Sequence, residues 1–358
     1  MSIGSAVSES GVPRWRKPQL LPFKSHLSDG SPQAPAAAPA QTSSWERYNK
    51  LTMEPSKEYL FTHKGFYFAA NITTPEYLDS LETFEIRDSD VFIATYPKSG
   101  TVWTQNILSL IFHEGHRNGT ENIDLMDRIP WLEYNTKHMD YSAFPSPRLF
   151  ATHLPLICLR LVFFFFLQVI YVTRNPKDVL VSYFHFSKIM VTLEKVSDFN
   201  IFMERFLAGK GKVSFLSWLD HVTGWHSHAE DFNILFLTYE EMKKDLRSAV
   251  LKICNFVGKT LSEKEVESVV RQATFENMRK DPRANYENLS EFLREKKPGY
   301  FLRKGTTGDW KNMMTVAQSE RVDEVLKEKM KNLPIKFIWD INEISSSVSP
   351  NQSPVAKH

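Results

Sequence analysis

The sequence has little cysteine and little excess charge. Its 358 residues include only two cysteines, Cys158 and Cys254, too few for a disulfide framework or for a metal cluster built from cysteines. The 44 Lys and Arg residues nearly balance the 42 Asp and Glu residues, which leaves a formal net charge of +2. We therefore do not expect a nucleic-acid binder that depends on excess positive charge, although one local anion site fits this balance.

The sequence also lacks a secretory signal and a convincing membrane span. Residues 1–20 mix Ser, Pro, Arg and Lys without an apolar stretch, so we expect a cytoplasmic protein. One apolar run, 156–172, has 17 residues and contains Arg160 and Gln168, whereas a spanning helix needs about 20 mostly apolar residues. It continues into the β-rich stretch VIYVTR, which favours a buried strand; a membrane-touching patch is the alternative.

The composition divides the chain into three parts. Residues 1–52 are rich in Pro, Ala and Ser and show no helical or strand period, which predicts a disordered N-terminal extension. Residues 53–344 have globular character. Residues 345–358 again read as a disordered tail. We expect one folded domain between two tails.

Apolar strands and helices alternate within the globular part. The patterns predict strands at 90–96, 169–173 and 234–237, and helices at 101–112, from 179 onward, and at 239–254, 261–273 and 316–330. Short apolar strands that alternate with helices are typical of a parallel sheet covered on both faces.

The sharpest chemical signal is the segment TYPKSGTVW at 95–103. It predicts a strand, a tight turn and a helix start, where free N–H groups and the helix dipole can seat phosphate or sulfate. Lys98 adds a positive charge, and Ser99 and Thr101 add hydroxyl donors. Lys98 precedes the only glycine, so this is not the GxxxxGK[ST] pattern, and no acidic magnesium ligand is evident. We expect an anion bound without a metal; an ordinary turn with a solvated lysine is the alternative.

Two later segments also carry cations. Arg174 follows a predicted strand, at the edge where open α/β sheets bind ligands, and Ser182 lies about two helical turns further on. The stretch FLRKGTTGDWK places Arg303 and Lys304 beside glycines whose backbone can approach a phosphate closely. Taken alone, the first segment fits an arginine paired with Asp178, and the second fits a solvated basic loop.

Together these segments resemble the cytosolic sulfotransferase family in both motif and order. TYPKSGTVW, RNPKDVLVS and RKGTTGDWKN are its signature stretches, and the resemblance spans residues 54–343. RNPKDVLVSYFHF, DPRANYE, FLRKG and KFIWDINE resemble the amine sulfotransferase branch in particular. The resemblance implies a single α/β domain in which a central parallel sheet is flanked by helices and carries a P-loop-like, phosphate-binding strand–turn–helix.

The resemblance also implies an activity. A sulfonate would move from 3′-phosphoadenosine 5′-phosphosulfate (PAPS), used as co-substrate without a metal, to the amine, phenol or alcohol group of a small acceptor, as in xenobiotic metabolism. A small-molecule kinase built on the same strand–turn–helix is an alternative. It would need GxxxxGK[ST] and a magnesium carboxylate, and we see neither.

The resemblance implies roles for matching residues. The 98–101 turn would hold the 5′-phosphosulfate, Arg174 and Ser182 the 3′-phosphate, and the 303–305 loop would close over that phosphate. Aromatic residues would contact the adenine. The full implied set is Lys98, Ser99, Gly100, Thr101, Val102, Trp103, Arg174, Ser182, Tyr239, Thr274, Phe275, Met278, Arg303, Lys304 and Gly305. Many family members have a threonine where this chain has Ala273, so Thr274 is an uncertain substitute.

The same resemblance implies that His153 in ATHLP is the catalytic base and that Lys98 stabilises the leaving group during in-line transfer. A neutral imidazole can accept a proton near neutral pH. Family members often have a lysine where this chain has Ala151. Lys98 would therefore carry more of the leaving-group stabilisation.

One segment departs from the family. Residues 157–168 read ICLRLVFFFFLQ, where relatives usually carry a loop and helix with Lys and Pro. Four consecutive phenylalanines would expose apolar area. If this segment displaces His153 and Arg174 on either side, the protein would be a cofactor-binding but catalytically impaired relative, which we keep as the alternative function.

The sequence also suggests a dimer contact and an acceptor pocket. Lys311–Glu320 matches the family's KxxxTVxxxE segment, which implies a homodimer, with Thr315 as helix N-cap in either case. Aromatic residues that could line an apolar acceptor pocket are Phe66, Tyr67, Phe68, Trp131, Phe184 and Phe186. An amine acceptor would favour a rim carboxylate, for which Glu133, Asp140 and Glu194 are candidates.

Overall fold

The computed structural model describes residues 56–117, 119–160, 167–209, 217–290, 293–295, 300–330 and 337–339. The tails expected at 1–52 and 345–358 lie outside these ranges. So do the phenylalanines at 163–166.

A four-stranded parallel sheet forms the centre of the domain. Its strands are β3 (Val91–Thr95), β4 (Leu149–Thr152), β5 (Gln168–Thr173) and β6 (Asn233–Thr238), in the spatial order β4-β3-β5-β6. The register pairs Ala94 with both Thr152 and Tyr171, and Thr173 with Thr238. The parallel sheet expected from the alternating pattern is confirmed, and the sequence reading missed only β4 among these strands.

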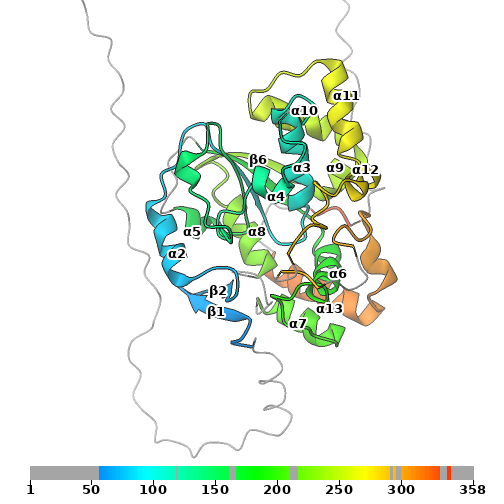
Figure 1. The fold of residues 1–358 in the computed structure, drawn as a ribbon. Helices are drawn as coiled ribbons and strands as arrows, with labels where there is room; N and C mark the ends of the chain where they lie inside the picture. The colour runs from blue at the N-terminus through cyan, green and yellow to red at the C-terminus, as the bar shows by residue number, and fades with distance from the viewer. Residues whose placement is uncertain are drawn as a thin grey trace, which may run out of the picture. The chain divides into compact units, whose positions relative to one another are not determined.

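Helices cover both faces of this sheet (Figure 1). The helices of the described residues are α2 (Pro75–Ser80), α3 (Thr101–Phe112), α4 (Leu125–Arg128), α5 (Leu156–Arg160), α6 (Pro176–Ser187), α7 (Phe199–Leu207), α8 (Trp218–His226), α9 (Tyr239–Lys244), α10 (Leu246–Phe256), α11 (Glu263–Gln272), α12 (Phe275–Lys280) and α13 (Val316–Lys329). Short 3₁₀ turns lie at Leu81–Thr83, Tyr141–Ala143 and Asp309–Asn312.

The alternation of side chains along the strands builds two cores. Val91 and Ile93 of β3 pack with α3, α10 and α11, while Phe92 of β3 packs on the opposite face near Trp225 of α8. Figure 1 shows α3, α10 and α11 together, apart from α5 and α8. Successive residues of a strand point to opposite faces of the sheet, and in β3 both sets are buried. Burial on both faces is typical of a parallel sheet.

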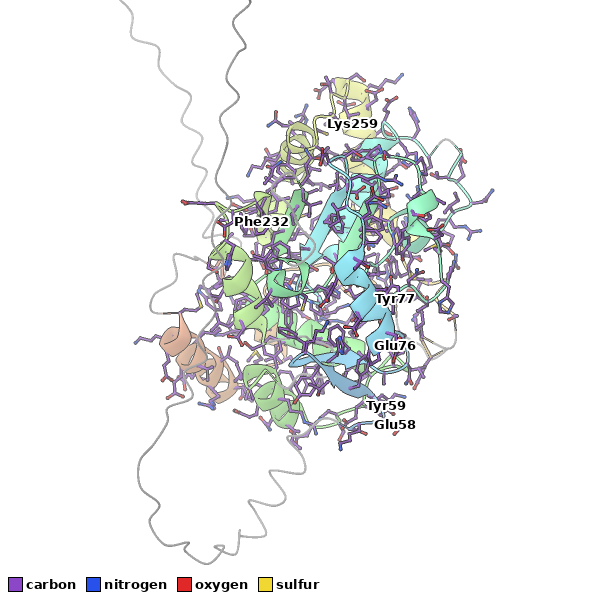
Figure 2. All side chains as sticks on the ribbon, turned by 90° about the vertical axis from the view of Figure 1, so that its left-hand side faces the viewer. Glu58, Tyr59, Glu76, Tyr77, Phe232 and Lys259 are labelled. Atoms are coloured by element: carbon purple, nitrogen blue, oxygen red, sulfur yellow. The ribbon has the colours of Figure 1, made fainter. Side chains whose placement is uncertain are left out.

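A two-stranded hairpin precedes the sheet. β1 (Leu60–His63) pairs antiparallel with β2 (Phe66–Ala69). In the view of Figure 2, Tyr59, next to β1, and Tyr77, in α2, lie below Lys259, which follows α10. Within the described ranges, no helix has both the length and the apolar character needed to cross a membrane.

The single helix expected at 239–254 is wrong, because the chain forms α9 and α10 instead. Asp245 has an extended ψ of 85° and its side chain accepts a hydrogen bond from the backbone N–H of Ser248. Aspartate is a preferred N-cap, so it ends one helix and begins the next. An amphipathic period continues across such a break, which is why periodicity alone did not reveal it.

Candidate active site

The carboxyl edge of the sheet supplies the site. Strands β3, β4, β5 and β6 end at Thr95, Thr152, Thr173 and Thr238. Lys98, His153, Arg174 and Tyr239 follow within three residues of those strand ends. Open parallel sheets bind ligands at this edge.

A cavity of about 440 Å³ opens there. It is lined by all but two of the site residues expected from the sequence, namely Lys98, Gly100, Thr101, Val102, Trp103, His153, Arg174, Ser182, Tyr239, Phe275, Met278, Arg303, Lys304 and Gly305. Ser99 and Thr274 are not among its lining residues. Ser99 is fully buried behind the turn, and the Thr274 hydroxyl caps α12 at the backbone N–H of Asn277.

The turn between β3 and α3 has a backbone that glycine permits. Gly100 has φ of 113°, and a Cβ there would lie 2.9 Å from the Tyr239 ring. Lys98 also has a positive φ, 70°. The first N–H groups of α3 have no acceptor within the helix, so they are available to an anion in the cavity.

Arg174 ties the three cationic segments together. Its Nη1 donates to the backbone carbonyl of Lys98 at 3.1 Å, and its Nη2 donates to that of Thr306 at 2.9 Å. Its guanidinium carbon also lies 4.1 Å from the centre of the Tyr239 ring. Asp178 instead accepts backbone N–H groups of the 308–310 segment. The alternative in which Arg174 pairs with Asp178 is therefore wrong.

The loop at 301–306 closes the cavity from the other side. Arg303 Nη2 and Lys304 Nζ each contact one carboxylate oxygen of Asp309 at 2.6 Å. Gly305 has φ of 63°, and a Cβ there would lie 2.1 Å from the Phe275 ring. Only glycine therefore lets this backbone rest against the ring.

The ammonium of Lys98 lies between aromatic rings. Its Nζ is 3.9 Å from the centre of the Phe186 ring and 5.0 Å from that of Phe301. Burial, together with the charges of Arg174 and Arg303, lowers the pKa of Lys98 to about 7. A negatively charged ligand would favour the protonated form and reverse this effect.

His153 presents one ring nitrogen to the cavity. Its Nδ1 lies 2.7 Å from the backbone carbonyl of Thr95, which can only accept, so Nδ1 carries the proton. Nε2 is then the unprotonated nitrogen, and it makes no hydrogen bond within the described part of the chain. Burial lowers the pKa of His153 to about 3, so the imidazole is neutral near pH 7.

An aromatic group forms the side of the cavity beside α3. The indole N–H of Trp103 donates to the carbonyl of Ala273 at 2.8 Å, and the Trp103 and Tyr239 rings meet edge to face at 5.2 Å. Phe275 and Met278 lie nearby on α12. Flat apolar side chains of this kind suit a planar base.

The cavity also has an apolar part that reaches the Lys98 ammonium at Phe186. Of the aromatic candidates for an acceptor pocket, Trp131 and Phe186 line the cavity. The other four are not among its lining residues; Phe68 and Phe184, for example, are buried in the core. None of the three candidate carboxylates lines it: Glu133 is fully buried, Asp140 caps a 3₁₀ turn, and Glu194 pairs with Arg205.

Lys243 and Tyr286 are among the lining residues that sequence reasoning missed. Lys243 lies one helical turn after Tyr239 on α9, so its i, i+4 spacing was a usable signal. Tyr286 has φ of 62°, and its hydroxyl donates to Gln105 Oε1 at 3.0 Å while accepting from Trp131 Nε1 at 3.1 Å. No local pattern marks such a long-range bridge.

The abnormal segment does not displace its neighbours at the site. α5 begins at Leu156, directly after the His153 strand end, and β5 delivers Arg174. Both side chains line the same cavity. The displacement expected of an impaired protein is therefore not observed at these two residues.

Comparisons with known proteins agree with this geometry. The family model described as "Sulfotransferase domain" matches residues 88–334. The chain is 54% identical over 307 residues to an amine sulfotransferase of Oryctolagus cuniculus, covering 82% of this chain and 98% of the relative. It is 42% identical to sulfotransferase 2B1 of Rattus norvegicus, covering 82% of this chain and 86% of the relative.

A solved structure is also similar. Mouse sulfotransferase SULT7A1 complexed with PAP superposes with a TM-score of 0.61 at 30% identity, covering 76% of this chain and 96% of that one. The family model covers the turn, His153, Arg174 and the closing loop in one match. The chain belongs to the sulfotransferase family.

Proposed function

We propose that the protein transfers a sulfonate from PAPS to the amine or hydroxyl group of a small acceptor. The observation that carries this proposal is the convergence of three distant cationic segments on one cavity that also holds the free Nε2 of His153. A surface cluster of cations would not include a buried, neutral imidazole.

The residues present fit a doubly phosphorylated adenosine. The described lining residues include Lys98, Arg174, Lys188, Lys243, Arg303 and Lys304, and no carboxylate. Within the described structure, Arg174 Nε is buried without a hydrogen-bond partner. Buried polar atoms are usually paired, so this nitrogen suits a ligand that supplies an acceptor oxygen nearby. The relative SULT7A1 was solved with PAP.

The proposed reaction is a direct transfer. A bond forms between sulfur and the acceptor nitrogen or oxygen, while the bond from sulfur to the 5′-phosphate oxygen breaks. His153 Nε2 takes the acceptor's proton, which the hydrogen bond from Nδ1–H to Thr95 makes possible. Lys98 and the N–H groups at the start of α3 stabilise the charge left on the phosphate oxygen.

The acceptor side favours a neutral, partly apolar molecule. Trp131, Phe186 and Tyr286 line it, and the described lining residues offer no carboxylate that would hold an ammonium group. An amine would therefore enter in its unprotonated form, with a lone pair ready to attack sulfur. The 54% identical relative bears the name amine sulfotransferase, which supports amines among the acceptors.

The proposal extends to assembly and location. Segment 311–320 runs from a 3₁₀ turn into α13, where Thr315 forms a capping box with Gln318 and Val316 is 75% exposed. An exposed apolar residue beside charged ones suits a two-fold contact, so we propose a homodimer through this segment. We also propose that the enzyme is cytoplasmic and acts in xenobiotic metabolism, on family grounds.

A turnover assay with radiolabelled PAPS across amines, phenols and alcohols tests the proposal. Label transfer to at least one acceptor class is expected. A thermal-shift measurement with PAP runs beside it. A PAP-dependent shift without any turnover would favour the impaired alternative, and neither shift nor turnover would overturn the proposed function.

A further inference from the structure

The backbone of His153 is held at both ends by buried side chains. Glu133 Oε1 accepts the His153 N–H at 2.7 Å, and the His153 carbonyl lies 3.2 Å from Nε2 of His221. A carbonyl can only accept, so His221 Nε2 carries a proton and donates it. Both Glu133 and His221 are 0% exposed.

The tautomer of His221 is fixed in turn by a third residue. Because Nε2 carries the proton, Nδ1 is the acceptor for the Tyr171 hydroxyl at 2.9 Å. The Tyr171 ring stacks on the imidazole at 5.8 Å, and Tyr96 meets it edge-on at 5.7 Å. Burial lowers the pKa of His221 to about 3, so it stays neutral and keeps one donor and one acceptor.

The restraints on His153 therefore come from three separate elements. Its N–H is bound from the segment before β4, its carbonyl from α8, and its ring from the Thr95 carbonyl at the end of β3. Trp131 also packs on the ring at 4.5 Å. With the peptide and Nδ1 fixed, the direction of Nε2 into the cavity is fixed as well.

The burial of the Glu133 carboxyl group is energetically unfavourable, which is unusual for a purely structural hydrogen-bond acceptor. Its second oxygen, Oε2, is buried without a hydrogen-bond partner within the described structure. Burying a polar atom unpaired is unfavourable, and such atoms in native structures call for an explanation. Burial raises the pKa of Glu133 to about 7, so an uncharged amide of the same shape is its closest replacement.

We propose that Glu133 and His221 are positioning residues, which clamp the His153 peptide from both sides so that Nε2 faces the acceptor. The proposal rests on the proposed function, because it assigns these residues to the base of that reaction. Displacing a base by about 1 Å can lower the rate about 100-fold. The gain in rate from such a clamp can therefore outweigh the unfavourable free energy of burying Glu133 and His221.

The test compares paired variants of the full chain. Glu133→Leu and His221→Phe remove the hydrogen-bonding groups, while Glu133→Gln and His221→Gln keep an acceptor and a donor respectively. We expect Leu and Phe to lower kcat by about 100-fold, and the Gln variants to recover most of it. The acceptor KM and the Kd of PAP should stay within about twofold of wild type, because neither residue lines the cavity.

Tyr77→Phe is the matched control. It removes a hydrogen bond of 2.7 Å to the carbonyl of Leu132, next to Glu133, but touches no atom of His153. Its kcat should remain that of wild type. If Glu133→Leu does not fold, the test uses His221→Phe and His221→Gln, together with Tyr171→Phe. Tyr171→Phe removes the hydroxyl that hydrogen-bonds to His221 Nδ1, so either tautomer of His221 can then form. It should lower kcat less than His221→Phe does.

Two results would overturn the proposal. One is wild-type kcat in a folded Glu133→Leu or His221→Phe variant. The other is an equal loss in the Leu and Gln variants of Glu133, which would show that the carboxyl group and not the clamp matters. His153→Ala distinguishes a failure of the positioning proposal from a failure of the proposed function. If that variant is fully active, the assignment of His153 as the base is itself wrong.

Discussion

Nδ1 of His153 lies 2.7 Å from the backbone carbonyl oxygen of Thr95, and this contact decides which nitrogen can act as a base. Because the carbonyl needs a donor, the proton stays on Nδ1 and the lone pair of Nε2 faces the cavity. We predict that His153→Ala lowers sulfonate transfer to a phenol by about 100-fold or more. The loss should be smaller with an amine, which can attack before it loses its proton.

The measurement is kcat for a phenol and an amine of similar size, with the PAP-induced thermal shift as control. The shift should persist, because the role that we propose for His153 is with the acceptor and not with the nucleotide. Full activity on both acceptors would remove His153 from the mechanism.

The protonation state of His153 gives a second prediction. Its pKa is lowered to about 3 by burial, so the ring stays neutral across the usable range. NMR of histidine-labelled protein should show no titration of His153 from about pH 5 to about pH 8, where an ordinary histidine would titrate. A His153 midpoint near the ordinary value would mean that water reaches the ring.

Lys98, unlike His153, should titrate near neutral pH and so make PAP affinity depend on pH. In the free protein its pKa is lowered to about 7 by burial and by Arg174 and Arg303. A bound anion raises that pKa, so binding takes up a proton above pH 7. Affinity for PAP is therefore full below the free-protein pKa and falls as pH rises above it, by up to about tenfold per pH unit.

Calorimetric titration with PAP in buffers of different ionisation enthalpy measures that proton uptake. Lys98→Arg is the matched variant, since a guanidinium remains charged throughout the range. Its affinity should be nearly constant with pH. An equal slope in wild type and Lys98→Arg would assign the dependence to another group.

Gly305 gives a steric prediction. A Cβ at this position would lie 2.1 Å from the Phe275 ring, at a φ of 63°. Gly305→Ala should push the loop off the ring and weaken PAP binding by about tenfold or more, an effect of about 1.4 kcal/mol. Gly308→Ala is the control, because it has a similar φ of 76° but nothing within 4 Å. Equal losses in the two variants would point to backbone strain instead of the contact.

A chelator tests whether a metal ion helps to neutralise the phosphate charges of PAPS. Lys98, Arg174, Arg303 and Lys304 surround the cavity and can balance two phosphate groups without help. Sulfonate transfer should therefore be unchanged by excess EDTA. Loss of activity with EDTA and recovery with added magnesium would contradict this part of the account.

The sequence predicted the start of α3 and the cations that follow buried strands. The segment from β3 into α3 was predicted within one residue, because an apolar strand, a glycine turn and a periodic helix follow each other there. The site residues also converge as expected, because carboxyl ends of parallel strands share one edge. The role of His153 came from family resemblance alone.

The long-range polar contacts could not be predicted. The Glu133 bond to His153, the His221 bond to its carbonyl and the Tyr286 bridge join residues far apart in sequence. Strand β4 was missed because LFAT is short and its apolar character is modest. Ser99 illustrates the reverse: the motif suggested a side-chain donor, whereas its hydroxyl is buried behind the turn.

A crystal structure of the full chain with PAP tests the central claim most directly. The account predicts one nucleotide per chain in the 440 Å³ cavity, with its 5′-phosphate at the start of α3 and its 3′-phosphate within hydrogen-bond reach of Arg174. His153 Nε2 should face the open space beside the 5′-phosphate. Density for PAP elsewhere, or a nucleotide that leaves Arg174 and Lys98 without contact, would contradict it.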